Sequence, residues 1–353
     1  MIDWRLPEHR RELFQRSYTF SLRHLNFPGM VYSMLPSIAE AFDLDEDGRA
    51  WLAWLNGNTQ NVVTSWLLLE AAPTHHDWKK AVDFWNEHFR ALEWDTDRRH
   101  QKSSFGKATE QWIAGPGRYP ALGWAEASMW GWEEAWKHAI SQPYMGRISA
   151  WSMLEFAKIL LPGIPDLEDW FLAESSSRSH RNALSFLYGY DDAWGWDREQ
   201  AELPRLLIGY EPLEELAEDL LAEARERNPG DPNVTRLSME SALCTFKSWH
   251  KPNRRYPNVY ADMMYQRIRK AEVRMNRTLD VLWLIRQESL PEYLRLEDMP
   301  YDPGLAPVKQ NWYRETGEVP LLHHHFINME KSGFDRKVES QEFGLRRDPS
   351  WKL

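Results

Sequence analysis

The chain has 353 residues, of which 42% are hydrophobic and 27% charged, so it can bury a sizeable core and lacks the composition of a disordered protein. Its net charge of −10 excludes a dedicated nucleic-acid coat protein, although local basic clusters can still contact phosphates. The one cysteine, Cys244, excludes an intramolecular disulfide and a cysteine-based zinc cluster.

The N-terminal residues lack the apolar segment of a signal peptide, and no stretch of about 18 apolar residues could cross a membrane. With the single cysteine, these features predict a cytoplasmic protein that does not bind a membrane. The 20 tryptophans are unusually many. We expect most of them in the core, while others could offer flat surfaces for stacking.

The predicted elements are helices. Residues 61–70 and 148–161 are apolar on most of their circumference, which favours buried helices. Residues 211–227 have apolar side chains at helical spacing with acids between them, and 228–232 then stops the helix. Residues 260–287 look like one long helix, basic in its first half.

No alternating pattern of convincing length indicates strands. The sequence therefore predicts an all-α fold, with a single helical body at 1–290 as the catalytic domain and an irregular C-terminal tail at 291–353 that wraps the body or frays.

Two short segments imitate known motifs. Residues 43–48 resemble the start of a calcium-binding EF-hand loop, but its twelfth position is Trp54 instead of a glutamate, so we expect the acids to cap the next helix. Residues 160–165 resemble the hairpin of helix-hairpin-helix DNA glycosylases. Pro165 replaces the second glycine, and a simple helix stop explains the segment equally well.

Polar residues 56–60 follow two tryptophans and precede the buried helix. The side chains of Asn56, Asn58 and Thr59 could read the edge of a base, as amides commonly do. The alternative is an N-cap with a glycine turn.

Residues 175–182 form a basic, hydroxyl-rich segment that leads into a helix. Arg178, His180 and Arg181 beside a helix start favour an anion such as a phosphate or pyrophosphate. The alternative is a solvated capping loop.

The segment 239–262 carries the richest chemistry. Glu240, Cys244 and Lys247 share one face of a predicted helix. The following loop holds one lysine, two arginines and two aromatic residues, and Asp262 lies on the next helix. An acid, a thiol, an amine and an arginine pair form a catalytic composition. The alternative is a salt-bridged surface with a buried cysteine.

The order and spacing of four segments resemble the phage α-glutamyl/putrescinyl-thymine pyrophosphorylases, also called amino acid:DNA transferases. The segments are 51–70, Gly146–Trp151, 181–191 and 240–262, and the resemblance extends over about residues 20 to 290.

The resemblance implies a reaction on phage DNA that contains 5-hydroxymethyluracil. A kinase pyrophosphorylates the hydroxymethyl group, and the transferase displaces pyrophosphate with the amine of an amino acid or polyamine. The hypermodified thymine shields the DNA from nucleases in the host cytoplasm. The implied partners are this DNA and a small amine. No cofactor is evident, although Mg²⁺ could accompany pyrophosphate.

The departing pyrophosphate needs cations, and the amine must lose a proton to a carboxylate such as Glu240 or Asp262. A Cys244 thiolate, its pKa lowered by Lys247, could add to C6 of the base as an alternative to direct displacement. The predicted catalytic residues are Glu240, Cys244, Lys247 and Asp262. The predicted substrate- and DNA-binding residues are Asn56, Asn58, Thr59, Arg147, Arg178, His180, Arg181, Arg254, Arg255 and Tyr256. No metal site is predicted.

Two other functions remain open from the sequence. One is a base-excising enzyme related to DNA glycosylases, and the other is a non-catalytic helical DNA-binding protein.

Overall fold

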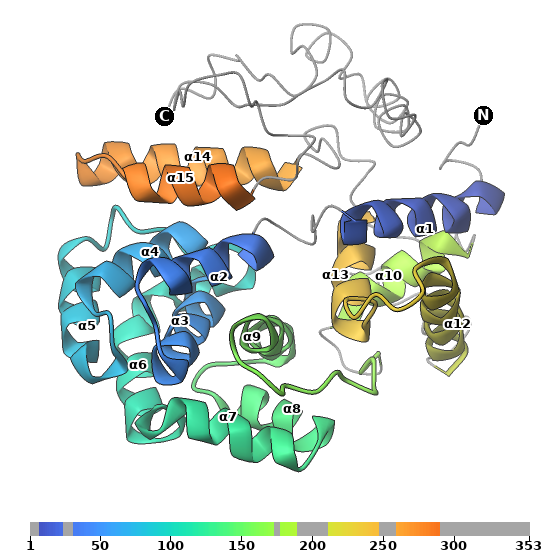
Figure 1. The fold of residues 1–353 in the computed structure, drawn as a ribbon, viewed down its shortest axis with the longest axis horizontal. Helices are drawn as coiled ribbons and strands as arrows, with labels where there is room; N and C mark the ends of the chain where they lie inside the picture. The colour runs from blue at the N-terminus through green and yellow to red at the C-terminus, as the bar shows by residue number, and fades with distance from the viewer. Residues whose placement is uncertain (1–6, 24–30, 173–176, 189–210, 247–258, 290–353) are drawn as a thin grey trace, which may run out of the picture. The chain divides into compact units, whose positions relative to one another are not determined.

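The computed structural model describes residues 7–23, 31–172, 177–188, 211–246 and 259–289 (Figure 1). Over these residues the chain is helical and contains no strand, which confirms the predicted all-α fold. They form two compact units. The predicted tail at 291–353 lies outside the described residues, and a single catalytic domain at 1–290 stays a prediction.

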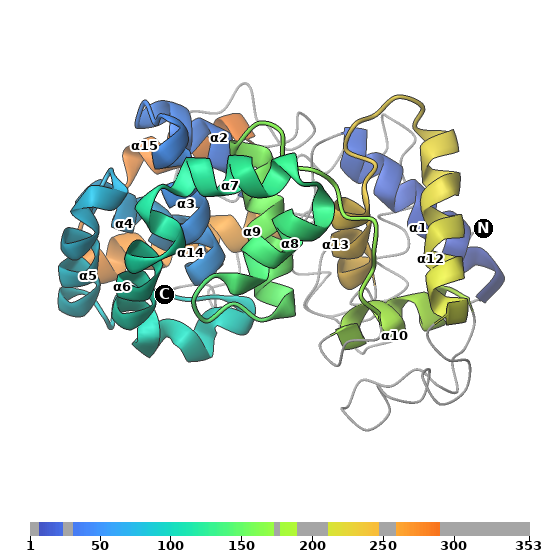
Figure 2. The same ribbon diagram turned by 90° about the horizontal axis from the view of Figure 1, so that it is seen from below.

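In the part of unit 1 that the structure describes, four whole helices pack together. They are α1 (Pro7–Arg23), α10 (Arg178–Leu187), α12 (Glu211–Arg227) and α13 (Arg236–Phe246). Helix α1 contacts the other three (Figures 1 and 2). The amphipathic pattern of 211–227 is confirmed, because Leu213, Ala217 and Leu220 of α12 are fully buried.

Unit 2 contains most of the remaining helices. They are α2 (Val31–Ala41), α3 (Glu46–Thr59), α4 (Val62–Ala71), α5 (Trp78–Glu87), α6 (Phe105–Ala114), α7 (Pro120–Met129), α8 (Trp132–Ser141), α9 (Arg147–Leu160) and α15 (Asp280–Ser289), with the short 3-10 helices η1 (His75–Asp77), η2 (Thr96–Ser104) and η3 (Pro116–Arg118). Helix α3 is central, since it contacts α2, α4, α7 and α9. The buried helices predicted at 61–70 and 148–161 correspond to α4 and α9.

The start of α3 confirms the interpretation of residues 43–48 as a helix cap. The Asp45 carboxylate accepts a hydrogen bond from the Gly48 amide at 2.8 Å, and Glu46 and Asp47 lie in the first turn. These acids stabilise the positive end of the helix dipole.

Helix α3 packs closely on α9 through Gly57. A Cβ atom at this position would lie 2.5 Å from the Met153 sulfur. The segment 56–59, expected to be a turn or an N-cap, is instead the last turn of α3, and Gln60 ends the helix in the left-handed conformation (φ 47°). The glycine therefore serves helix packing and does not make the turn.

The prediction of one long helix over 260–287 is wrong. The structure has α14 (Val259–Met275) and α15, separated at Asn276, which adopts a left-handed conformation (φ 50°). The Glu272 carboxylate accepts hydrogen bonds from the Leu279 amide (3.0 Å) and the Trp283 indole (2.8 Å). The bond to Glu272 satisfies the backbone amide of Leu279, which has no partner within a helix at the break. This bond lowers the free energy that the break would otherwise cost. No helix in the described residues is long and apolar enough to cross a membrane.

His138 of α8 makes the stability of unit 2 depend on pH. Its ring packs edge-on against Trp124 (centroids 4.5 Å apart) and contacts the Gln142 amide at 3.1 Å, and burial lowers its pKa from 6.5 to about 4. The unfolded chain takes up this proton near pH 6.5 and the folded chain only near pH 4. The free energy of unfolding should therefore fall by up to about 3 kcal/mol as the pH drops through this window.

The measurement is urea unfolding of the wild type and of His138→Gln between pH 4 and 7. We expect the variant to lose most of this pH dependence. The exposed His100 offers the control His100→Gln, which should keep it. Equal pH dependence in the wild type and His138→Gln would contradict the assignment.

Candidate functional site

A buried acid–imidazole pair lies in unit 1, between α10 and α13. His180 Nε2 contacts Glu240 Oε1, an arrangement that becomes an ion pair when the imidazole is protonated, and the side chains are 3% and 10% exposed. Ionisable groups are costly to bury unless they are paired, so the burial of both side chains indicates a specific arrangement. The sequence placed these residues in separate motifs, and the packing of α10 on α13 brings them together.

Arg181 and Cys244 belong to the same two helices. Arg181 is fully buried and donates from Nη1 to the Leu172 carbonyl oxygen at 2.6 Å. Cys244 is half-buried and lies one helical turn beyond Glu240. An acid, an imidazole, a guanidinium and a thiol are thus concentrated on α10 and α13, which is a composition suited to proton transfer and anion binding.

The described part of the segment before α10 differs from a solvated capping loop, which was the alternative to an anion-binding segment. Ser177 is fully buried, and its hydroxyl donates to the Phe171 carbonyl oxygen at 2.6 Å instead of capping α10. Asn182 is also buried. Arg178 begins α10, but its side chain lies outside the description.

Several other predicted residues fall outside the described parts. Lys247, Arg254, Arg255 and Tyr256 belong to the segment 247–258, which is not described. Asp262 lies in the first turns of α14 without a described side chain. Their catalytic or phosphate-binding roles stay predictions.

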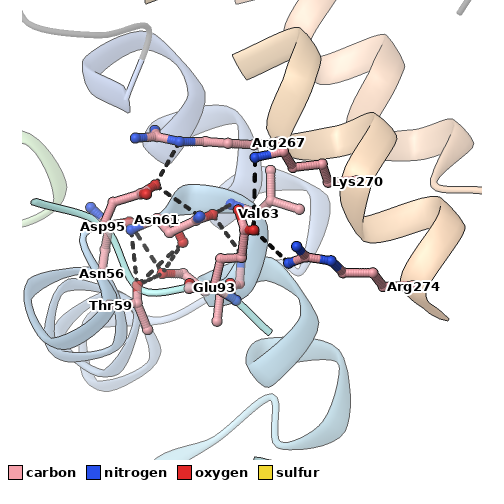
Figure 3. Close-up of polar contacts among 11 residues, drawn as sticks. Asn56, Thr59, Asn61, Val63, Glu93, Asp95, Arg267, Lys270 and Arg274 are labelled. Carbon is pink, nitrogen blue, oxygen red and sulfur yellow. Dashed lines mark hydrogen bonds and ion pairs between the residues drawn. The ribbon is translucent and has the colours of Figure 1, made fainter. Parts of the chain in front are cut away.

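A second polar cluster lies in unit 2, where α3 ends and α4 begins (Figure 3). The Ser65 hydroxyl donates to Asn56 Oδ1 at 3.1 Å and lies 2.8 Å from the Thr59 hydroxyl. Asn61 caps α4 by accepting from the Val63 and Thr64 amides. Asn56 and Thr59 are fully buried and hold the α3–α4 junction, and their contact with a base stays a prediction.

Asp95 connects this junction to α14. Its Oδ2 accepts a hydrogen bond from Asn61 Nδ2 at 2.9 Å and forms an ion pair with Arg267 Nε at 2.6 Å (Figure 3). Burial raises the pKa of Asp95, while Arg267 acts in the opposite direction. Lys270 and Arg274 of α14 pair with Glu93 beside it.

Residues 264–275 of α14 belong to unit 2, and their basic side chains therefore pair with acids of the same unit. Arg277, just beyond the helix, pairs with Glu70 in the same way. The spacing of 267, 270, 274 and 277 could have indicated a single charged face. Nothing local to Asp95 marked it as the partner of Arg267.

Arg98 joins three segments around the end of α3, although no pattern in the sequence marks it as a site residue. Its Nε donates to the Asn58 carbonyl oxygen at 3.1 Å, and its Nη1 donates to the Tyr144 carbonyl oxygen at 2.6 Å and to the Ser149 hydroxyl at 3.3 Å. Arg147, one of the predicted substrate-binding residues, is also buried, and its guanidinium lies 4.8 Å above the Trp151 ring. Two buried guanidinium groups thus lie at the start of α9 and beside it.

Buried cationic, acidic and imidazole groups in an all-helical protein fit an enzyme that handles anionic substrates. Residues 31–255, more than half of the chain, match the family described as amino acid:DNA transferase, so the chain belongs to that family. The match includes α2 to α9 of unit 2 and α10 to α13 of unit 1. Membership assigns the chain to the transferases that act on DNA with an amino acid.

A curated relative is the protein named serinyltransferase from Salmonella phage ViI. It is 25% identical over 349 residues, covering 92% of this chain and 84% of the relative. No solved structure matches the chain, so a relation to DNA glycosylase folds stays a prediction.

Proposed function

We propose that the protein transfers the amine of an amino acid onto a pyrophosphorylated 5-hydroxymethyluracil in DNA, with release of pyrophosphate. The observation that carries the proposal is the buried His180–Glu240 pair in a chain of the amino acid:DNA transferase family. The named activity of the phage ViI relative supports an amino acid as the amine donor, with serine as the first candidate.

In this reaction the amine nitrogen bonds to the exocyclic carbon of the base as the carbon–oxygen bond to pyrophosphate breaks. Pyrophosphate leaves with the bonding electrons, and its charge needs cationic partners such as Arg181. In this step His180 begins as a neutral imidazole whose Nε2 faces Glu240, and the amine proton passes to its Nδ1. The carboxylate of Glu240 stabilises the imidazolium that forms.

The test uses DNA with pyrophosphorylated hydroxymethyluracil, incubated with the protein and each standard amino acid. Nucleoside mass spectrometry should show a thymidine whose mass is increased by the amino acid, together with an equal amount of pyrophosphate. Abasic sites would instead identify a base-excising enzyme, and unchanged nucleosides would identify a non-catalytic DNA-binding protein.

Cys244 offers a covalent variant of this mechanism. Its thiolate could add to C6 of the base and expel pyrophosphate, which leaves an exocyclic methylene. The amine then adds to this methylene, and the thiolate leaves C6, which restores the C5–C6 double bond and frees the enzyme. If this route operates, Cys244→Ser should fold normally and lose transfer by at least about 100-fold, since covalent catalysis requires the thiolate. The wild type should also form a protein–DNA adduct with DNA whose target base carries fluorine at C5. Normal turnover in Cys244→Ala would make the cysteine structural and favour direct displacement.

A further inference from the structure

Asn58 has a buried side-chain amide that meets no hydrogen-bond partner in the part of the chain that the structure describes. Its side chain has no exposed surface, and neither Oδ1 nor Nδ2 forms a hydrogen bond among the described residues. Leaving buried polar groups unsatisfied costs about 1–3 kcal/mol each, and native proteins satisfy nearly all of them. The neighbouring Asn56 at least uses its Oδ1, which accepts from Ser65. The unsatisfied amide of Asn58 therefore points to a bound polar group.

The surroundings of Asn58 favour a ligand that carries negative charge. The Arg98 guanidinium, only 2% exposed, is bonded to the Asn58 carbonyl oxygen and reaches Ser149 in the first turn of α9. Gly146 precedes the first residue of α9 and provides no side-chain cap, and a Cβ at Gly146 would meet no atom within 4 Å. A helix start and a buried guanidinium both favour an anion.

We propose that Asn58 and Arg98 form the subsite that binds the α-carboxylate of the amino acid substrate; this inference rests on the proposed function. Asn58 Nδ2 donates to a carboxylate oxygen, and Arg98 supplies the compensating charge. Asn58 Oδ1 accepts a hydrogen bond from an N–H of the substrate's own amine. The lone pair of that amine stays available for attack. A carboxylate and an amine on one carbon match the acceptor and donor needs of the amide. Because Asn58 has no exposed surface, the subsite has to open for the ligand and then enclose it.

The experiment compares an amino acid with its decarboxylated amine. The probes are L-serine and ethanolamine, or the corresponding pair for the amino acid that the wild type transfers fastest. In Asn58→Leu we expect the KM for L-serine to rise at least about tenfold. Loss of a hydrogen bond to a charged group weakens binding by at least this factor. The loss with ethanolamine should be smaller, because ethanolamine lacks the carboxylate and loses only the contact of its amine with Asn58 Oδ1. The KM for DNA should change less than twofold.

Asn58→Asp tests the same subsite with a nearly isosteric change. Its carboxylate repels that of L-serine, so the preference should shift toward ethanolamine. This reversal of preference would not follow from a loss of stability. A larger thermal shift of the wild type with L-serine than with ethanolamine at equal concentration checks binding without turnover.

Gln142→Leu is the matched control in unit 2. The Gln142 amide is satisfied inside the protein, since its Oε1 accepts from the Trp112 indole at 2.6 Å and its Nε2 donates to the His138 carbonyl oxygen at 3.1 Å. We expect this variant to lower the unfolding temperature and to leave the KM for L-serine unchanged.

An unchanged ratio of L-serine to ethanolamine rates in both Asn58 variants would overturn the inference. So would a higher inhibition constant for inorganic pyrophosphate with no change for L-serine, because the ligand would then be the leaving group. In either case the wild type still transfers the amino acid and the proposed function stands. A wild type that transfers no amino acid to DNA refutes the proposed function and this inference together.

Discussion

Glu240→Gln is expected to lower the rate of amino acid transfer by about 100-fold or more, the lower range for general acid–base catalysis. Glutamine keeps the shape of glutamate and can still contact His180, but it cannot stabilise an imidazolium by charge. The conservative change matters, because removing one partner of a buried pair outright costs about 3–5 kcal/mol and could unfold unit 1. The measurement is single-turnover formation of the modified nucleoside, followed by mass spectrometry.

Glu223→Gln is the matched control in the same unit. Glu223 forms ion pairs with Arg11 (2.6 Å) and Arg227 (2.7 Å), but its side chain is 22% exposed. Exposed pairs contribute little to stability, so we expect transfer within twofold of the wild type. A Glu240→Gln variant with wild-type turnover would remove the acid–imidazole pair from the mechanism. Proton transfer would then fall to Asp262 or another group.

Trp112→Ala should destabilise unit 2 by about 3–5 kcal/mol, the range for truncating a buried tryptophan. The Trp112 ring stacks on Trp54 (centroids 5.0 Å apart, interplanar angle 8°) and lies 5.4 Å from the Trp51 ring. Its indole nitrogen donates to Gln142. The change therefore leaves a cavity at the centre of α3 and α6 and an unpaired amide. Chemical unfolding followed by circular dichroism measures the loss.

Trp130→Ala provides the contrast, since this side chain is 77% exposed at the end of α7. Substitution of an exposed side chain should change stability by no more than about 0.5 kcal/mol. Equal destabilisation by the two substitutions would mean that Trp130 is covered in solution. A clear difference would show that the buried tryptophans serve core packing, which is the role the sequence favoured for most of them.

The fold class and several helices followed from local patterns. The apolar spacing of residues 211–227 predicted α12 with its observed bounds, and Asp45 marked the start of α3. The break between α14 and α15 was missed, because apolar periodicity continues across it. Its signals were Asn276, which tolerates the left-handed conformation, and Glu272, whose side chain satisfies the Leu279 amide across the break.

The sequence by itself determined helix positions and the kinds of chemistry available, because apolar period and capping depend on neighbours within a few residues. It placed His180 and Glu240 in two candidate segments, but only the packing of α10 on α13 made them a pair. Only the tertiary structure also placed Arg98 beside Asn58. These contacts join residues 40 to 60 positions apart, and a single sequence contains no local pattern that specifies which distant side chains meet when helices pack.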